Sequence, residues 1–264
     1  MANDIVRIIR QGPIAVVQID RGYDPNPLCY RTLKGVTEAA HSLEDAGDVT
    51  VVVLTGRPNV FTAGIDLKDP ETARLMGASI RARRKAAELG ARMCRAWEEL
   101  TPVTIAAIEG YCLGGGVSLA VSCDFRVLAQ GARLAVPELK LGMSMSWHTL
   151  PRLTNLVGPA RAKRIVLLAE MIAAAEALAW GLADWVVDDG QALTHAMSIA
   201  RKVAEMPPLP VYMTKKSINV HATALNRLAS YMDDDQFALT TLTKDHLEGV
   251  TAFVEKRTPE FKGE

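Results

Sequence analysis

The sequence has few aromatic residues and no net charge. Aromatic side chains make up 5% of its 264 residues, whereas hydrophobic residues make up 49%, so aliphatic side chains must fill most of the core. Lys and Arg together number 30, as do Asp and Glu, so the chain lacks the clustered basic face of a nucleic-acid-binding protein. A local patch for a small anion remains compatible with this balance.

Paired cysteines and long apolar runs are also missing. No two cysteines form a CxxC pair, and no histidine stands at zinc-finger spacing, so the sequence predicts free thiols in a reducing compartment. The first ten residues carry Asp4, Arg7 and Arg10, unlike the apolar region of a signal peptide. No run of about 18 uncharged apolar residues is present, which excludes a membrane-spanning helix. The sequence therefore predicts a cytoplasmic protein.

Short β-branched runs alternate with helical patterns through residues 1–206. The runs at 5–10 and 14–19 flank a Gln-Gly-Pro turn and predict a hairpin. Further strands are expected at 49–54, 103–108, 125–129, 134–136 and 185–187. Helices are expected at 33–43, 72–100, 117–122, 159–168, 173–180 and 192–204. The length fits one large α/β domain built of repeated β-β-α units.

A proline-rich segment at 207–210 separates this core from the C-terminal part. Residues 211–257 have the spacing of three helices. The sequence therefore predicts an α/β core over 1–206 followed by a helical region over 207–264.

A run of three glycines follows the predicted strand at 103–108. In Gly114-Gly115-Gly116 the backbone can turn sharply and come close to a ligand. The first N–H groups of the helix that follows lack internal partners and carry partial positive charge. Such groups can stabilise an oxyanion, although a tight turn with close packing explains the glycines equally well.

Two further segments contain residues suited to the same chemistry. The segment 61–67 (Phe-Thr-Ala-Gly-Ile-Asp-Leu) follows another strand, and its small residues allow a second N–H group to point outward. Glu138 follows a strand and Pro137 among apolar neighbours, which raise the pKa of a carboxylate and suit it to proton transfer. Taken singly, the first segment is typical of an ordinary loop and Glu138 of a helix start.

Together these segments resemble the crotonase (enoyl-CoA hydratase/isomerase) superfamily. They match its patterns F-x-A-G-x-D, G-x-x-x-G-G-G and P-E-x-x-x-G in order and spacing, and Asn26-Pro27-Leu28 and the tail 248–257 resemble further family signatures. The resemblance covers nearly the whole chain. It implies a crotonase-like spiral of β-β-α units with a C-terminal α-helical trimerisation region.

The resemblance also implies roles for particular residues. The main-chain N–H groups of Ile65 and Gly115 would form an oxyanion hole for a thioester carbonyl, and Glu138 would be the catalytic acid and base. The substrate pocket would be formed by Ser118, Ala63, Gly114, Gly142, Ser146, Trp147 and His148. CoA would be bound by Arg21, Lys68, Lys215, Phe253 and Lys256, the last two serving a neighbouring subunit. No metal and no cofactor is implied, other than the CoA carried by the acyl-CoA substrate, and the expected assembly is a homotrimer or a dimer of trimers.

The sequence departs from the hydratase pattern at two places. Hydratases of the family use two glutamates, and the first of these positions is Ser118, which cannot take a proton at neutral pH. This departure favours double-bond isomerisation, with hydration as the alternative. Trp147 adds bulk where the family has a small residue, so it should reshape the acyl pocket. His148 is either an extra acid or base, or a structural or solvent-facing residue.

Two other functions compete with this prediction. Gly116-Val117-Ser118 resembles part of a serine-hydrolase nucleophile elbow, with His195 or His221 as the base. That elbow needs its serine at the apex of a sharp turn, whereas Ser118 would lie within a helix. Loss of the first glutamate also fits an acyl-CoA-binding protein without catalytic activity. A dinucleotide site is excluded because Leu119 stands where the motif needs glycine.

Overall fold

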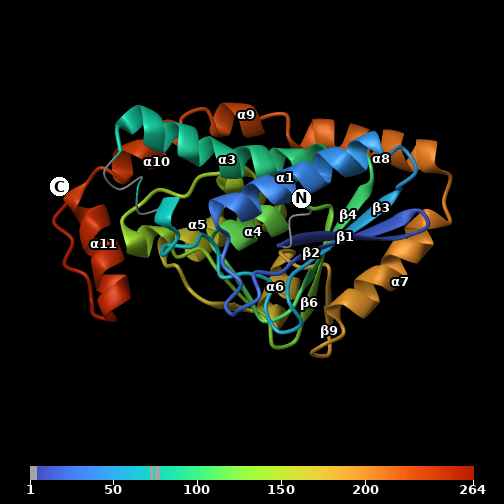
Figure 1. Ribbon diagram of the computed structural model, residues 1–264, viewed down its shortest axis with the longest axis horizontal. Helices are drawn as coiled ribbons and strands as arrows, with labels where there is room; N and C mark the ends of the chain where they lie inside the picture. Colours follow the sequence, from blue (N-terminus) through green and yellow to red (C-terminus); the bar gives the residue numbers. More distant parts are fainter. Residues whose placement is uncertain (1–4, 72–73, 75–77) are drawn as a thin grey trace.

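The computed structural model describes residues 5–71, 74 and 78–264, and a six-stranded sheet lies at its centre (Figure 1). Only the first two strands pair antiparallel, and all the others are parallel to their neighbours. In spatial order the strands are β1 (Val6–Gln11), β2 (Ile14–Ile19), β3 (Val51–Thr55), β4 (Val103–Ile108), β6 (Phe125–Ala129) and β9 (Trp185–Val187). The hairpin and the α/β core predicted from the sequence are thus confirmed, and the structure adds that the core strands pair in parallel.

Apolar cores lie on both faces of this sheet. Successive side chains of a strand point to opposite faces, so Val52 and Leu54 of β3 join one core and Val51 and Val53 join the other. Helices α1 (Tyr30–Asp45) and α3 (Ile80–Glu99) lie side by side over the first face, and α7 (Ala192–Ala204) covers the second (Figure 1). A strand covered on both faces is apolar throughout, which is why it appears as a continuous run in the sequence.

A small second sheet and several short elements position the loops of the site. The sheet contains β5 (Tyr111–Leu113), β7 (Arg133–Ala135) and β8 (Ile172–Ala173). Around it stand the short helix α4 (Gly115–Ala120), the 3-10 turn η1 (Glu138–Leu141), α5 (Thr149–Leu167) and α6 (Ala174–Trp180). Because β5 and β7 pair in parallel, the starts of α4 and η1 emerge at the same edge of this sheet.

The C-terminal helices run around one side of the core (Figure 1). They are α8 (Pro208–Ala222), α9 (Asn226–Ala229), α10 (Asp233–Thr240) and α11 (Lys244–Glu255). Helix α10 packs against α3, and α11 packs against η1. The end of the chain therefore covers the region where the predicted site residues gather.

Two sequence predictions need correction in detail. The helix expected over 72–100 begins at Ile80, where Ser79 accepts a hydrogen bond from the N–H of Ala82; positions 72–73 and 75–77 lie outside the described residues. The three helices expected over 211–257 are four separate elements among the described residues, because breaks near 223–225, 230–232 and 241–243 interrupt the pattern. Within the described ranges, no helix is both long and apolar enough to cross a bilayer.

Candidate active site

Two loops that leave neighbouring strands lie against each other. Between them, the N–H of Thr62 donates to the carbonyl of Tyr111 (2.9 Å), and that of Leu113 donates to the carbonyl of Thr62 (3.0 Å). Gly64 has a φ of 84°, and a Cβ atom there would lie 2.7 Å from the carbonyl oxygen of Leu113 and 3.4 Å from the main-chain nitrogen of Gly115. Only glycine allows this approach, which places Ile65 next to the start of α4.

Among the described residues, no acceptor takes a hydrogen bond from the N–H group of Ile65 or of Gly115. Leu28 donates to the carbonyl of Gly64 and accepts from the N–H of Asp66, so the intervening N–H of Ile65 points away from Leu28. Gly115 is the first residue of α4, where an N–H has no partner within the helix. Both residues line the same cavity. The arrangement fits two donors for one oxyanion.

Glu138 opens η1 and lines that cavity. The residue as a whole is half-buried, but its Oε2 atom is shielded from water and has no hydrogen-bond partner among the described residues. Burial raises the pKa of this carboxyl from the usual value of 4.5 to about 7. A Cβ atom on Gly114 would lie 2.4 Å from Oε1, so glycine at 114 gives the carboxylate its space. Such a group can both take and return a proton near neutral pH.

The cavity has a volume of about 120 Å³, and its walls are mostly apolar. Helix α11 closes one side: Gly249 packs directly on the backbone of Leu141, and Nδ1 of His246 lies 2.8 Å from the Leu141 carbonyl. Lining residues that the sequence did not single out are Tyr30, Leu33, Leu67, Arg83, Ala86, Ala87, Met143, Met145, Phe237, Thr241, His246 and Val250. They come from α1, α3, α10, α11 and the loops between elements, and no motif links such distant segments.

Trp147 lines the cavity and packs on two glycines. A Cβ atom on Gly90 would lie 1.8 Å from indole Cε2, and one on Gly115 would lie 2.3 Å from Cζ3. Trp147 and His148 have φ values of 61° and 57°. Such left-handed conformations are strained for residues with side chains, by roughly 1–3 kcal/mol each, and persist only where surrounding contacts hold them. Trp147 therefore forms part of the wall of this cavity.

The predicted pocket residues are only partly brought together. Ser146 and Trp147 line the cavity, whereas Ala63, Gly114 and Gly142 stand in the segments that form it without lining it. Ser118 is fully buried behind Gly115, and its hydroxyl accepts a hydrogen bond of 2.7 Å from Thr149 instead of facing the cavity. In the described part of the chain it has no histidine partner, so the geometry does not support a serine hydrolase.

His148 lies on the other side of Trp147. It lines a separate polar cleft together with Glu98 and Arg152, and it does not line the cavity that Glu138 lines. Burial lowers the pKa of its imidazole to about 4, so the ring is neutral at physiological pH. Of the two roles predicted for His148, the structural one fits this position.

The residues predicted to bind CoA are spread over three places. Arg21 and Lys68 lie beside the Ile65 loop, where Arg21 forms an ion pair of 3.2 Å with Asp66 and the N–H of Lys68 donates to the same carboxylate. Lys215 is largely buried at another groove, where its ammonium lies 2.6 Å from Asp124. Phe253 and Lys256 stand at the end of α11, largely exposed. The structure therefore does not bring Lys215 to this cavity.

The chain is similar to known proteins over nearly its whole length. The profile of the enoyl-CoA hydratase/isomerase family matches residues 10–264. The short-chain-enoyl-CoA hydratase of Clostridium acetobutylicum is 33% identical over 97% of this chain and 96% of its own length. The crotonyl-CoA hydratase of Syntrophomonas wolfei is also 33% identical, over 99% of both chains.

Solved structures extend the likeness to the fold. An enoyl-CoA hydratase from Mycobacterium avium subsp. paratuberculosis superposes with a TM-score of 0.87 at 25% identity, over 98% of both chains. One from Bacillus anthracis gives a TM-score of 0.77 at 30% identity, over 99% of this chain and all of the other. The predicted crotonase fold is thus confirmed, and the chain is an enzyme of the enoyl-CoA hydratase/isomerase family.

Proposed function

We propose that this enzyme moves the double bond of a 3-enoyl-CoA to the 2-position. The observation that carries this proposal is that Glu138 is the one carboxylate among the described residues that line the cavity. Ser118, at the position of a hydratase's other glutamate, is buried and bonded to Thr149. Isomerisation needs a single group that removes and returns one proton, whereas hydration also needs an activated water.

The reaction would proceed in two proton transfers. The thioester oxygen would accept hydrogen bonds from the N–H groups of Ile65 and Gly115. The ionised Glu138 would remove a proton from C2 of the 3-enoyl group, and the electron pair would spread over a dienolate. The protonated Glu138 would return the proton to C4, leaving a 2,3 double bond. These steps need proton transfer and carbonyl polarisation only, so the proposal includes no cofactor beyond the CoA of the substrate.

Hydration of a 2-enoyl-CoA is the second candidate, and the names of the relatives favour it. Both relatives described above are called hydratases. In this chain, Glu138 would then have to activate water and protonate the α-carbon without help from a second carboxylate.

One substrate panel distinguishes the two reactions. Straight-chain 2-enoyl-CoA and 3-enoyl-CoA esters are incubated with the enzyme, and the products are analysed by mass spectrometry and chromatography. We expect 3-enoyl esters to give products of unchanged mass and altered retention. Rapid addition of one water to 2-enoyl esters, without isomerisation, would overturn the proposal in favour of hydration. A protein that binds these esters without turnover would support the non-catalytic alternative.

Introducing a second carboxylate tests why hydration is disfavoured. Ser118→Glu alone would bury a charge beside Thr149 and outside the cavity, so we expect an unstable protein and no gain in hydration. The indole packs on Gly115, one helical turn before position 118, so the double variant Ser118→Glu/Trp147→Ala has space there, and the hydratase-to-isomerase ratio should rise. Ser118→Gln/Trp147→Ala fills nearly the same volume without ionising and is the matched control. An equal ratio in both double variants would count against this explanation.

The cations beside the Ile65 loop are the best supported of the predicted CoA contacts. Arg21 and Lys68 stand next to the proposed oxyanion site, where both contact Asp66. Lys68 is exposed, so its ammonium is free to reach a phosphate in solution. Lys68→Ala should raise KM for acyl-CoA and leave kcat nearly unchanged, whereas Lys34→Ala, at an exposed position of α1, is the control.

We further propose that the enzyme assembles as a homotrimer or a dimer of trimers. Helix α8 has no buried residue in the single chain, and large apolar side chains there and around α9 are exposed. They include Leu209, Met213, Ile218, Val220, Leu225, Leu228 and Tyr231. An apolar surface of this kind marks an interaction site in a protein. Light scattering coupled to size-exclusion chromatography measures the assembly directly, and a monomer at micromolar concentration would contradict the proposal.

A further inference from the structure

Trp147 stands between the acyl cavity and a polar cleft. Helix α3 passes both: its residues Arg83, Ala86 and Ala87 line the cavity, whereas Glu98, near its end, lines the cleft. Gly90 lies between these two parts of the helix and packs directly on the indole. The indole therefore lies beside the part of α3 where the cavity ends.

The indole also reaches the proposed oxyanion site. Its six-membered ring packs on Gly115, and its five-membered ring packs on Gly90. The side chain thus extends from α3 to the start of α4 and fills the space between them. A glycine at each contact brings the ring against the backbone, so the wall has little room to move.

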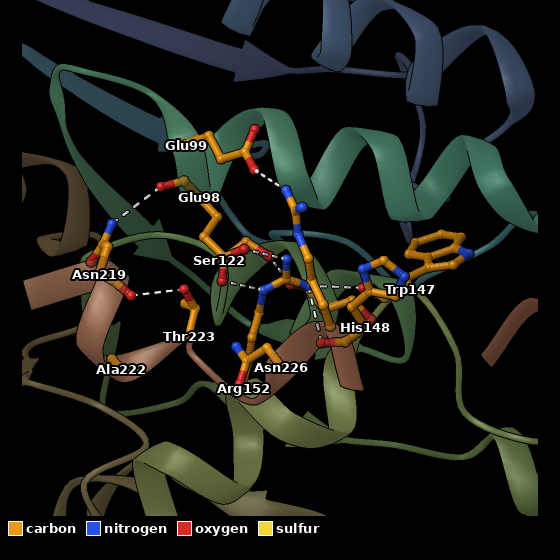
Figure 2. A network of polar contacts seen from close by, with 12 residues as sticks. Glu98, Glu99, Ser122, Trp147, His148, Arg152, Asn219, Ala222, Thr223 and Asn226 are labelled. Carbon is orange, nitrogen blue, oxygen red and sulfur yellow. Dashed lines mark hydrogen bonds and ion pairs between the residues drawn. The ribbon is translucent and has the colours of Figure 1, made fainter. Parts of the chain in front are cut away.

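A buried arginine fixes the backbone that carries this ring. The Nη1 group of Arg152 donates to the carbonyl oxygens of Trp147 (2.9 Å) and His148 (3.0 Å), the two residues with left-handed backbone (Figure 2). Its Nε and Nη2 groups donate to the two carboxylate oxygens of Glu98, both at 2.7 Å. Asp233 adds a contact from α10 by accepting the N–H of His148 at 3.0 Å.

This geometry gives Arg152 more than a packing role. A guanidinium held in a two-pronged contact with a carboxylate has a fixed direction. Glu98 lies on α3, the helix that also carries Gly90, so the pair fixes the Trp147 backbone relative to the surface on which its ring packs. Lysine has one point charge and cannot make these four contacts.

We propose that Trp147 is the wall that limits the length of the acyl group, and that Arg152, held by Glu98, is the residue that positions this wall. The inference rests on the proposed acyl-CoA substrate and adds to it a substrate class, namely acyl chains that end at the indole. Beyond the indole lies the cleft, with a volume of about 520 Å³, that Glu98, His148 and Arg152 help to line. Removing the ring extends the acyl cavity in that direction.

The primary test compares acyl chains of increasing length. We measure kcat/KM for a series of straight-chain enoyl-CoA esters with the wild type, Trp147→Phe and Trp147→Ala. One methylene that fits an apolar pocket changes kcat/KM by about 10–200-fold. The long-to-short ratio should therefore rise at least about tenfold in Trp147→Ala and less in Trp147→Phe. An unchanged ratio in a folded Trp147→Ala protein would overturn the proposal.

A double-mutant cycle tests the positioning role of Arg152. Arg152→Lys keeps the charge but loses the two-pronged contact, so it should shift the chain-length ratio in the wild-type background. In the Trp147→Ala background it should lower stability again but leave the ratio where Trp147→Ala put it. A purely structural Arg152 would change stability in both backgrounds and the ratio in neither, and that result would refute its positioning role.

Substitution of Gly90 tests the proposal without changing Trp147 or Arg152. Gly90→Ala places a methyl group against the indole and should displace it, whereas in the Trp147→Ala background the same methyl group has space. The ratio should change in the first case only. Calorimetric titration with saturated acyl-CoA esters distinguishes failure of the proposed function from failure of the proposed wall. If the wild type binds none of them, the proposed function fails and this inference fails with it; binding with an unchanged ratio in all variants refutes the wall alone.

Discussion

The two glutamates on either side of Trp147 show how one functional group serves opposite purposes. Glu138 lines the acyl cavity, and its Oε2 atom has no hydrogen-bond partner among the described residues. Glu98 lines the polar cleft, and both of its carboxylate oxygens accept hydrogen bonds from Arg152. Both residues are partly buried, but within the described part of the chain only Glu98 forms an ion pair.

The two arrangements differ in whether the carboxylate remains available to bind a proton. A buried carboxylate without a cation is costly as an anion, and this cost gives it a proton affinity useful at neutral pH. A carboxylate bound by a guanidinium has its lone pairs occupied, and it holds structure instead. The indole of Trp147 therefore stands between the unpaired carboxylate of the cavity and the ion pair of the cleft.

Changing the unpaired carboxylate should have the largest effect. Glu138→Gln keeps size and polarity but removes proton transfer, so we expect turnover to fall by about 10²–10⁴-fold. Steady-state kinetics on the best substrate of the panel measures this loss. Circular dichroism and acyl-CoA binding should match the wild type, which separates lost chemistry from lost fold. Near-normal turnover would mean that another group moves the proton.

Changing the paired carboxylate should affect stability before chemistry. Glu98→Ala leaves a guanidinium that is 5% exposed without its partner, which should lower the free energy of unfolding by about 3–5 kcal/mol. Removing an exposed pair by Arg92→Ala should cost less than about 1 kcal/mol. Urea titration of both variants gives the comparison. Equal losses would mean that burial of the Arg152 pair adds nothing.

The pH dependence of stability and activity gives a further test of the difference between the two glutamates, because it follows from the unpaired state of Glu138. Its pKa rises from 4.5 to about 7 on folding, so the folded protein binds an extra proton between these values. The resulting stability is complete below about pH 4.5 and is lost as the pH rises through 7. Glu138→Gln should therefore match the wild type at low pH and exceed it by up to about 3 kcal/mol above pH 7. Wild-type activity should increase with pH through the same range, because the base is the ionised form. Parallel stability curves for the two proteins across this range would show that the carboxylate is not desolvated.

The smallest effect should come from changing Ser118, which neither lines the cavity nor takes part in the Glu98–Arg152 ion pair. Ser118→Ala removes the hydroxyl that accepts from Thr149 and should cost about 1 kcal/mol of stability. Turnover should stay at the wild-type level, because the hydroxyl does not face the cavity. Thermal unfolding and kinetics on the same sample test both statements. A large loss of turnover would place Ser118 in the reaction after all.

The sequence predicted the parts of the site that depend on local motifs. Gly115 and Glu138 follow β5 and β7, which pair in parallel, and the loop that carries Ile65 joins β5 through the bridge between Thr62 and Cys112. A glycine that must accept a positive φ or a close neighbour leaves a visible signal, and so does a glutamate among apolar residues. The joint match to the family patterns therefore points to these three residues, and all three line one cavity.

The remaining parts depend on contacts between distant segments. Phe237 and Val250 reach the cavity only because the last helices fold back over η1, and nothing in residues 207–264 specifies that direction. In the sequence, Gly90 is only a helix-destabilising residue within α3. The structure shows that it gives the indole of Trp147 its space. Lys215 has the charge expected of a phosphate ligand, but Asp124 satisfies it at another groove.

The burial of the four cysteines has a practical consequence for observing this fold in motion. All four thiols are buried, and burial raises the pKa of Cys94 to about 11 and that of Cys123 to about 12. Alkylating reagents attack the thiolate, so at neutral pH they reach these groups only during transient openings. Cys94 lies one helical turn beyond Gly90, whereas Cys112 lies in β5. The labelling rates of these two cysteines therefore compare local opening behind the indole with local opening of the small sheet.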